Sequence, residues 1–83
     1  MIKRVVLSTQ AQADLAALDR AVALRIAGAI NRFAATGAGN VQGLRGIHPP
    51  EFRLRAGDWR VRFHDHGDWI DVLRIRNRRD AYR

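Results

Sequence analysis

The hydrophobic pattern divides the chain into an extended start, a helical middle and an extended end. The start contains the strand-forming run Val5–Leu7, which predicts a strand over residues 2–7. After it, apolar residues recur every three or four positions as far as Phe33, which is the spacing of helices that bury one side. From Glu51 onward apolar and polar residues alternate, and this alternation is typical of strands with one buried face.

The middle of the chain predicts two helices joined tightly as a hairpin. Ser8 or Thr9 can cap the first helix and Asp19 the second, because short polar side chains accept hydrogen bonds from the free N–H groups at a helix start. Gly37 and Gly39 are expected to end the second helix. We expect one apolar stripe of this helix to face a sheet, and it consists of Val22, Ile26, Ile30 and Phe33.

The last third predicts three strands, near residues 52–55, 59–64 and 69–75. Gly57-Asp58 and Gly67-Asp68 supply turns between them. Residues 43–50 are expected to form an irregular connector, because Pro49 and Pro50 oppose helix and central strand alike.

These elements predict a small single α+β domain over residues 1–83, with the order β-α-α-β-β-β. An N-terminal strand and a two-helix hairpin would precede a three-stranded antiparallel sheet, and both helices would pack on one face of that sheet.

Arginines alternate with apolar residues in the predicted strands, so the exposed face of the sheet should carry guanidinium groups. Pleating directs Phe52 and Leu54 to one side and Arg53 and Arg55 to the other. The same alternation adds further polar residues to the exposed face, namely Glu51, Arg60, Arg62, His64, Arg74 and Arg76. Like charges on one face repel one another, and arginine binds phosphate with paired donors. The pattern indicates a nucleic-acid partner; the alternative is a solvated face of an arginine-rich protein.

Composition supports a polyanionic or acidic partner. The 83 residues include 15 basic and 8 acidic side chains, for a formal net charge of +7. The absence of cysteine excludes disulfides and thiolate metal sites and fits a cytoplasmic protein. No run of eighteen apolar residues occurs, so we expect no membrane span.

The segment His64-Asp65-His66 is the one hint of a metal site. The spacing of the sequence offers no third or fourth ligand beside it, so we expect neither a metal nor another cofactor.

Three stretches of the chain match a known pattern. They read Leu44-Arg45-Gly46, then FRLRAGDWRVRF over residues 52–63, and then RNRRDAYR over residues 76–83. With the strand and helical hairpin before them, they resemble the RelE/ParE superfamily of toxins from bacterial type II toxin–antitoxin modules. The resemblance covers essentially the whole chain, and Arg78 and Tyr82 are typical of the RelE branch.

The resemblance implies a metal-independent endoribonuclease that cuts mRNA in the ribosomal A site, where the 2′-hydroxyl attacks the adjacent phosphate. By resemblance Arg60 binds the scissile phosphate, and Arg53 stands where the family often has lysine. Arg76 or Arg78 matches the C-terminal arginine, and Tyr82 matches a tyrosine that stacks on or orients the substrate.

The sequence does not decide which side chain acts as the general base. Arginine stays protonated, so Arg53 cannot remove a proton, and the alternatives are Glu51, His48 and His64. We expect additional nucleic-acid contacts from the remaining arginines of this region, which are Arg45, Arg55, Arg62, Arg74 and Arg79.

Two other functions fit the same family. One is a ParE-like inhibitor of DNA gyrase without ribonuclease activity, and the other is a degenerate toxin. All three imply a cognate antitoxin with an acidic or amphipathic segment, and binding of operator DNA by the toxin–antitoxin complex. The ribonuclease reading adds the ribosome and mRNA as partners.

Overall fold

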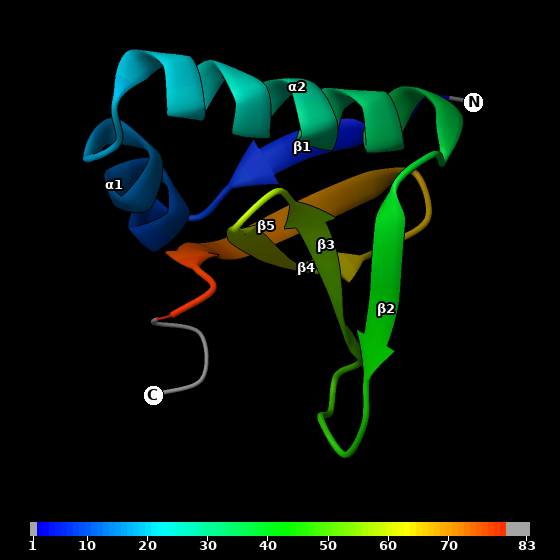
Figure 1. The fold of residues 1–83 in the computed structure, drawn as a ribbon. Helices are drawn as coiled ribbons and strands as arrows, with labels where there is room; N and C mark the ends of the chain where they lie inside the picture. The colour runs from blue at the N-terminus through cyan, green and yellow to red at the C-terminus, as the bar shows by residue number, and fades with distance from the viewer. Residues whose placement is uncertain (1, 80–83) are drawn as a thin grey trace.

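The computed structural model describes residues 2–79, which form one sheet and two helices. The elements are β1 (Arg4–Leu7), α1 (Thr9–Ala16), α2 (Arg20–Thr36), β2 (Asn40–Leu44), β3 (Glu51–Ala56), β4 (Trp59–Asp65) and β5 (Trp69–Asn77). The long helix α2 runs along one face of the sheet, and α1 lies near the N-terminal end of α2 (Figure 1). The predicted α+β class is confirmed.

The sheet differs from the prediction in its number of strands. It has five strands in the order β1-β5-β4-β3-β2, where the sequence predicted a separate N-terminal strand and three antiparallel ones. The strand β1 joins the sheet by parallel pairing, with Arg4 opposite Trp69 and Leu7 opposite Val72. The sheet is therefore mixed, because the other neighbouring pairs are antiparallel.

The second correction is β2, which lies partly in the segment expected to be irregular. Its sequence has few strand-forming residues. It extends because it pairs with the edge of β3, which places Val41 beside Leu54 and Gln42 beside Arg53. The irregular segment is the shorter stretch 45–50, which contains both prolines.

The helix boundaries follow the predicted caps. The Ser8 hydroxyl accepts a hydrogen bond from the backbone of Ala11 at 3.0 Å and donates one to the carbonyl of Leu73 at 2.8 Å. Asp19 caps α2, and Gly37 ends it with a left-handed φ of 76°. The Ser8 cap therefore also attaches the start of α1 to β5.

The core lies between α2 and the sheet. Ile26, Ile30 and Phe33 of the predicted stripe are buried there. The Phe63 ring from β4 lies 5.2 Å from the Phe33 ring and 5.7 Å from the Phe52 ring, measured between centroids. This packing fixes which side of each strand faces the helices, and so leaves the alternate residues on the opposite face.

A bulge in β5 keeps this alternation consistent. Arg74 is opposite Arg62 and Val72 is opposite Phe63, so β5 has one additional residue, Leu73, between the two pairs. As a result both Val72 and Ile75 are buried, and Arg74 still shares a face with the arginines of β4. Within the described residues, no helix combines the length and apolar character that crossing a membrane requires.

Candidate nucleic-acid interface

The face of the sheet opposite the helices carries two adjacent cross-strand rows of arginine. One row, nearer the β3–β4 turn, consists of Asn40, Arg55, Arg60 and Arg76. The next row consists of Gln42, Arg53, Arg62 and Arg74. We call these two rows the basic face. The third row has a different character, since it contains Leu44, Glu51, His64 and Asp71.

A hollow of about 110 Å³ opens in the basic face. Its lining residues are Asn40, Gln42, Arg53, Arg55 and Arg60. All five side chains carry N–H donors, and none of the five is acidic. A hollow of this size holds a few waters, at roughly 30 Å³ each. Its chemistry suits a small oxyanion such as a phosphate group.

Arg60 is the innermost residue of this hollow. Within residues 2–79 it is the one buried charged side chain, with 6% of its surface exposed. Its Nη1 donates to the carbonyl oxygens of Gly57 at 2.9 Å and Trp59 at 3.1 Å. These bonds hold the guanidinium against the β3–β4 turn, and they satisfy only part of its donor capacity.

The other arginines of the hollow differ in their contacts. Arg53 donates to the Oε1 atom of Gln42 at 2.9 Å, which orients it along the strand pair. Arg55 is exposed. Among the described residues neither Arg55 nor Arg76 has a hydrogen-bonded side-chain partner. The basic face thus combines oriented guanidinium groups with two that are available to a ligand.

Arg62 is paired with the acidic row. Its guanidinium donates to Oε2 of Glu51 at 2.9 and 2.5 Å. The Oε1 atom of the same carboxylate lies 3.8 Å from Nε2 of His64. Glu51 therefore lies between a fixed cation and a histidine.

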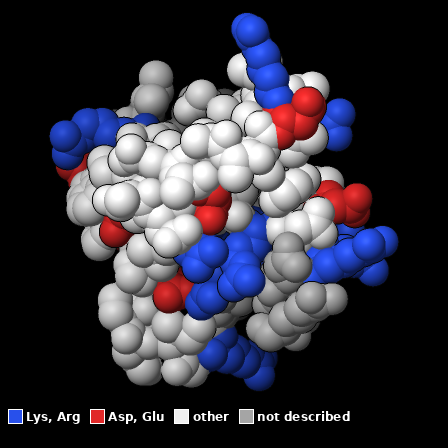
Figure 2. Space-filling model, turned by 90° about the vertical axis from the view of Figure 1, so that its left-hand side faces the viewer, with Lys and Arg blue, Asp and Glu red and all other residues white. Residues whose placement is uncertain are grey.

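Arg74 is paired away from the hollow. Its Nε donates to Oδ2 of Asp14 on α1 at 2.9 Å, and the backbone N–H of Ile75 donates to the same oxygen at 2.9 Å. Burial raises the pKa of Asp14, but the bonds from Arg74 and Ile75 lower it further, so the pKa lies below its ordinary value. The side of the molecule that carries α1 shows basic groups near its middle with acidic atoms among them (Figure 2).

The remaining predicted residues lie around this face. Arg78 and Arg79 are exposed on the turn after β5, where the Arg78 N–H donates to the carbonyl of Asp58 at 2.6 Å. This places Arg78 at the same end of the sheet as the hollow. Tyr82 lies outside the described residues.

Arg45 and His48 are exposed on the β2–β3 loop, which projects from the body of the sheet (Figure 1). Leu44 and Glu51, at the base of this loop, are partners in the third row. Hence the Leu44–Glu51 pair lies between His48 and the arginines of the hollow, and the structure does not bring His48 together with Arg60.

Sequence reasoning missed several contributors to the region. Asn40 and Gln42 line the hollow because β2 joins the sheet, and Asp14 reaches Arg74 from a helix. Asp71 lies beside His64 and His66, where no third metal-ligating side chain was expected. The alternation over residues 69–75 could have placed Asp71 on this face. The bulge in β5 could not be predicted, and it determines that Asp71 lies opposite His64.

The comparisons with known proteins agree with one another. A family model for the ParE toxin of the type II toxin–antitoxin system parDE matches residues 5–82. No curated protein matches the chain. The fold is similar to a chain of the archaeal RelE–RelB complex from Pyrococcus horikoshii OT3, with a TM-score of 0.74 and 25% identity over 94% of this chain and 97% of that one.

Two further toxin–antitoxin complexes have the same fold. The RelB–RelE complex from Methanococcus jannaschii matches with a TM-score of 0.73 and 21% identity, over 93% of this chain and 94% of that one. The RelBE2 complex from Mycobacterium tuberculosis matches with a TM-score of 0.68 and 21% identity, over 93% and 99%. The family model and the shared fold together show that this chain belongs to the RelE/ParE superfamily of toxins of type II toxin–antitoxin systems.

Proposed function

We propose that this toxin is a ribosome-dependent mRNA endoribonuclease that inhibits translation and is neutralised by a cognate antitoxin. The observation that carries the proposal is the donor-lined hollow of the basic face. Ribonuclease chemistry of this type needs a group of fixed donors around the phosphorane, where negative charge develops. Arg55 and Arg60 would supply these donors, with Arg53 held beside them by Gln42.

Glu51 would act as the general base that removes the 2′-hydroxyl proton. The 2′-oxygen would bond to phosphorus as the bond to the 5′-oxygen breaks, and the 5′-oxygen would take a proton from water. It is an acidic residue of the row next to the basic face, and Arg62 fixes its Oε2 atom. Its Oε1 atom has no hydrogen-bonded partner among the described residues and is the atom that would accept the proton. Arg76 and Arg78 would contribute to phosphate binding, and Tyr82 would hold the base by stacking.

A cognate antitoxin is the expected protein partner. The solved structures with this fold are toxin–antitoxin complexes, and a net charge of +7 favours an acidic segment on the basic face. The toxin–antitoxin pair would also bind its operator DNA.

Inhibition of DNA gyrase is the second candidate, and two observations favour it. The matching family model is that of ParE. In addition, Arg60 directs Nη1 at the backbone of its own turn, which is a structural use of a residue that the ribonuclease needs for substrate.

Expression of the toxin without antitoxin, followed by separate labelling of protein and DNA synthesis, distinguishes the two functions. The ribonuclease predicts early loss of protein synthesis and mRNA ends that map inside codons. Early loss of DNA synthesis with intact mRNA would overturn it in favour of gyrase inhibition, and no effect on either would indicate a degenerate toxin.

Variants test whether the hollow is responsible. Arg55→Ala removes an exposed guanidinium from the hollow, and Glu51→Gln removes the proposed base while keeping its size. General bases typically contribute about 10²–10⁴-fold to rate, so Glu51→Gln should abolish toxicity at moderate expression. Arg25→Ala, on the exposed surface of α2, is the matched control and should remain as toxic as the wild type.

A further inference from the structure

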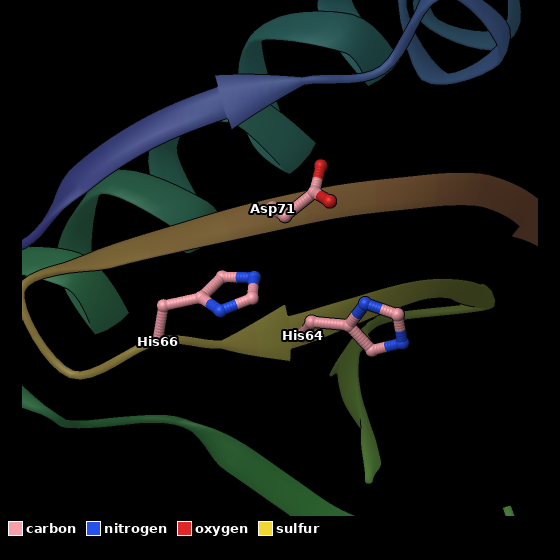
Figure 3. A group of neighbouring side chains, drawn as sticks. All are labelled: His64, His66 and Asp71. Carbon is pink, nitrogen blue, oxygen red and sulfur yellow. The ribbon is translucent and has the colours of Figure 1, made fainter. Parts of the chain in front are cut away.

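His64, His66 and Asp71 form a compact cluster at one end of the sheet. One potential ligand atom from each residue lies within 4.8 Å of those of the other two. Figure 3 shows both imidazole rings on the same side of β4, with a ring nitrogen of each directed toward the space beside Asp71. The third row of the sheet thus ends in His64 and Asp71, and His66 lies next to them.

The fold explains why these three residues meet. Residues two apart on a strand point to the same face, so His64 and the residue that follows β4, His66, lie side by side. Asp71 is the cross-strand partner of His64 on β5. The backbone N–H of His66 donates to the carbonyl of Trp69 at 2.9 Å, which closes the turn between the strands.

Each of the two rings has a neighbouring side chain close to it. The His66 ring stacks on Trp69 with 4.1 Å between centroids and 15° between planes. The Nε2 atom of His64 is buried and, among the described residues, has no hydrogen-bond partner. It faces Oε1 of Glu51 at 3.8 Å. A metal-binding histidine usually donates its second N–H to a carboxylate, and Glu51 lies next to that position without forming this hydrogen bond.

The local charge also favours a cation, in contrast to the chain as a whole. The segment from β4 to β5 contains Asp65, Asp68 and Asp71, which are three of the eight acidic residues, and two of the three histidines. Lys3 neutralises Asp65 at 2.8 Å. Among the described residues, no side chain donates a hydrogen bond to the carboxylate of Asp71, which therefore remains available as a ligand.

We propose that His64, His66 and Asp71 bind a first-row divalent transition metal such as Zn²⁺. Two imidazoles and one carboxylate are ligands that such ions accept, with open positions left for water. Metal–ligand bonds of about 2.0–2.1 Å place tetrahedral ligands roughly 3.3 Å apart. In the cluster the ligand atoms lie within 4.8 Å of one another, and binding of an ion would draw them together. The ion would bind near the end of β4, whereas Arg60 of the hollow is at its start, and it would tie the β4–β5 turn together.

Calorimetric titration of the untagged toxin with Zn²⁺ tests the site, with Co²⁺ absorption as a readout of coordination. We expect one ion per chain and a visible Co²⁺ band. His66→Phe keeps the aromatic stack on Trp69 but removes a ligand, and Asp71→Asn removes the carboxylate. Each should weaken binding by at least about tenfold, since even indirect supports of metal sites typically contribute 10–100-fold.

His48→Ala is the matched control, because it removes the histidine that lies outside the cluster, on the β2–β3 loop. It should bind Zn²⁺ as the wild type does. Circular dichroism checks that each variant is folded. Absence of Zn²⁺ binding by the wild type would overturn the proposal. So would an affinity for Zn²⁺ in His66→Phe or Asp71→Asn that equals that of the wild type.

Discussion

Asp14 on α1 and Arg74 on β5 form an ion pair of 2.9 Å between residues that are 60 positions apart. The same carboxylate accepts the backbone N–H of Ile75. Pairing with β1 ends at Val72, so beyond that point the edge of β5 is covered by a helix side chain. Asp14 thus takes the place of a strand neighbour and ties α1 to the basic face.

Replacement of Asp14 by alanine should lower the stability of the fold. The change leaves the Ile75 N–H without its acceptor, and an unpaired buried backbone donor costs about 1–3 kcal/mol. The free energy of unfolding, measured with urea and circular dichroism, should fall by this amount. Asp68→Ala, on an exposed turn, should leave it nearly unchanged; an equal loss in both variants would contradict the role of Asp14.

Acid should destabilise the protein through Asp14 and Asp65. Burial raises the pKa of Asp65, but hydrogen bonds from Lys3 and the N–H of Gly67 lower it further, so the pKa lies below its ordinary value, as for Asp14. A carboxyl with a lowered pKa in the folded state stabilises the fold above its unfolded pKa of about 3.9. That contribution is lost as the pH falls through the folded pKa.

The melting temperature followed from neutral to strongly acidic pH measures this effect. The double variant Asp14→Asn, Asp65→Asn should be less stable at neutral pH and should lose less stability on acidification than the wild type. If the melting temperature falls equally with pH in the wild type and the double variant, other carboxyl groups cause the acid sensitivity.

Arg55 should contribute to single-stranded RNA binding through phosphate contact. Each neutralised phosphate of a single strand changes the slope of log K against log salt by about 0.7. Arg55→Ala should therefore weaken binding of an oligoribonucleotide and lower the steepness of its salt dependence by about that amount. Arg25→Ala on α2 is the control, and an unchanged slope in Arg55→Ala would place the phosphate elsewhere.

Gly39 and Gly28 should respond oppositely to alanine. Gly39 has a φ of 151°, and an added Cβ would lie 2.9 Å from the Leu54 side chain, so Gly39→Ala should destabilise by about 1–3 kcal/mol. Gly28 lies in α2, and an added Cβ would have no neighbouring atom from elsewhere in the fold within 4 Å. Gly28→Ala should stabilise by roughly 0.8–1 kcal/mol, because alanine favours the helix. The free energy of unfolding, measured by chemical denaturation, should fall in Gly39→Ala and rise in Gly28→Ala.

Local signals in the sequence were sufficient for the helices and for four of the strands, β1, β3, β4 and β5. Capping by Ser8 and Asp19, termination at Gly37 and the turn at Gly57 depend on residues only a few positions apart, and the structure has all of them. The alternation also predicted which arginines share a face, because pleating is a property of any strand.

The strand β2 and the parallel pairing of β1 could not be predicted in this way. The strand-forming tendency of residues 40–44 is weak, and they extend because β3 offers free backbone groups. The contact between Arg4 and Trp69 depends on the whole chain in between. The partners of the charged side chains could not be predicted for the same reason. Arg74 pairs with Asp14 on a helix, and Glu51 pairs with Arg62 across a hairpin.

The sequence by itself determined the character of the two faces of the sheet, with arginine on one and the apolar core on the other. Only the tertiary structure decided what each charged residue does there. It left Arg55 available, held Arg60 against its turn and brought Asp71 to the histidines. The physical reason is that residue type and period 2 decide the face of a side chain, whereas its partners depend on register, bulge and packing across long separations.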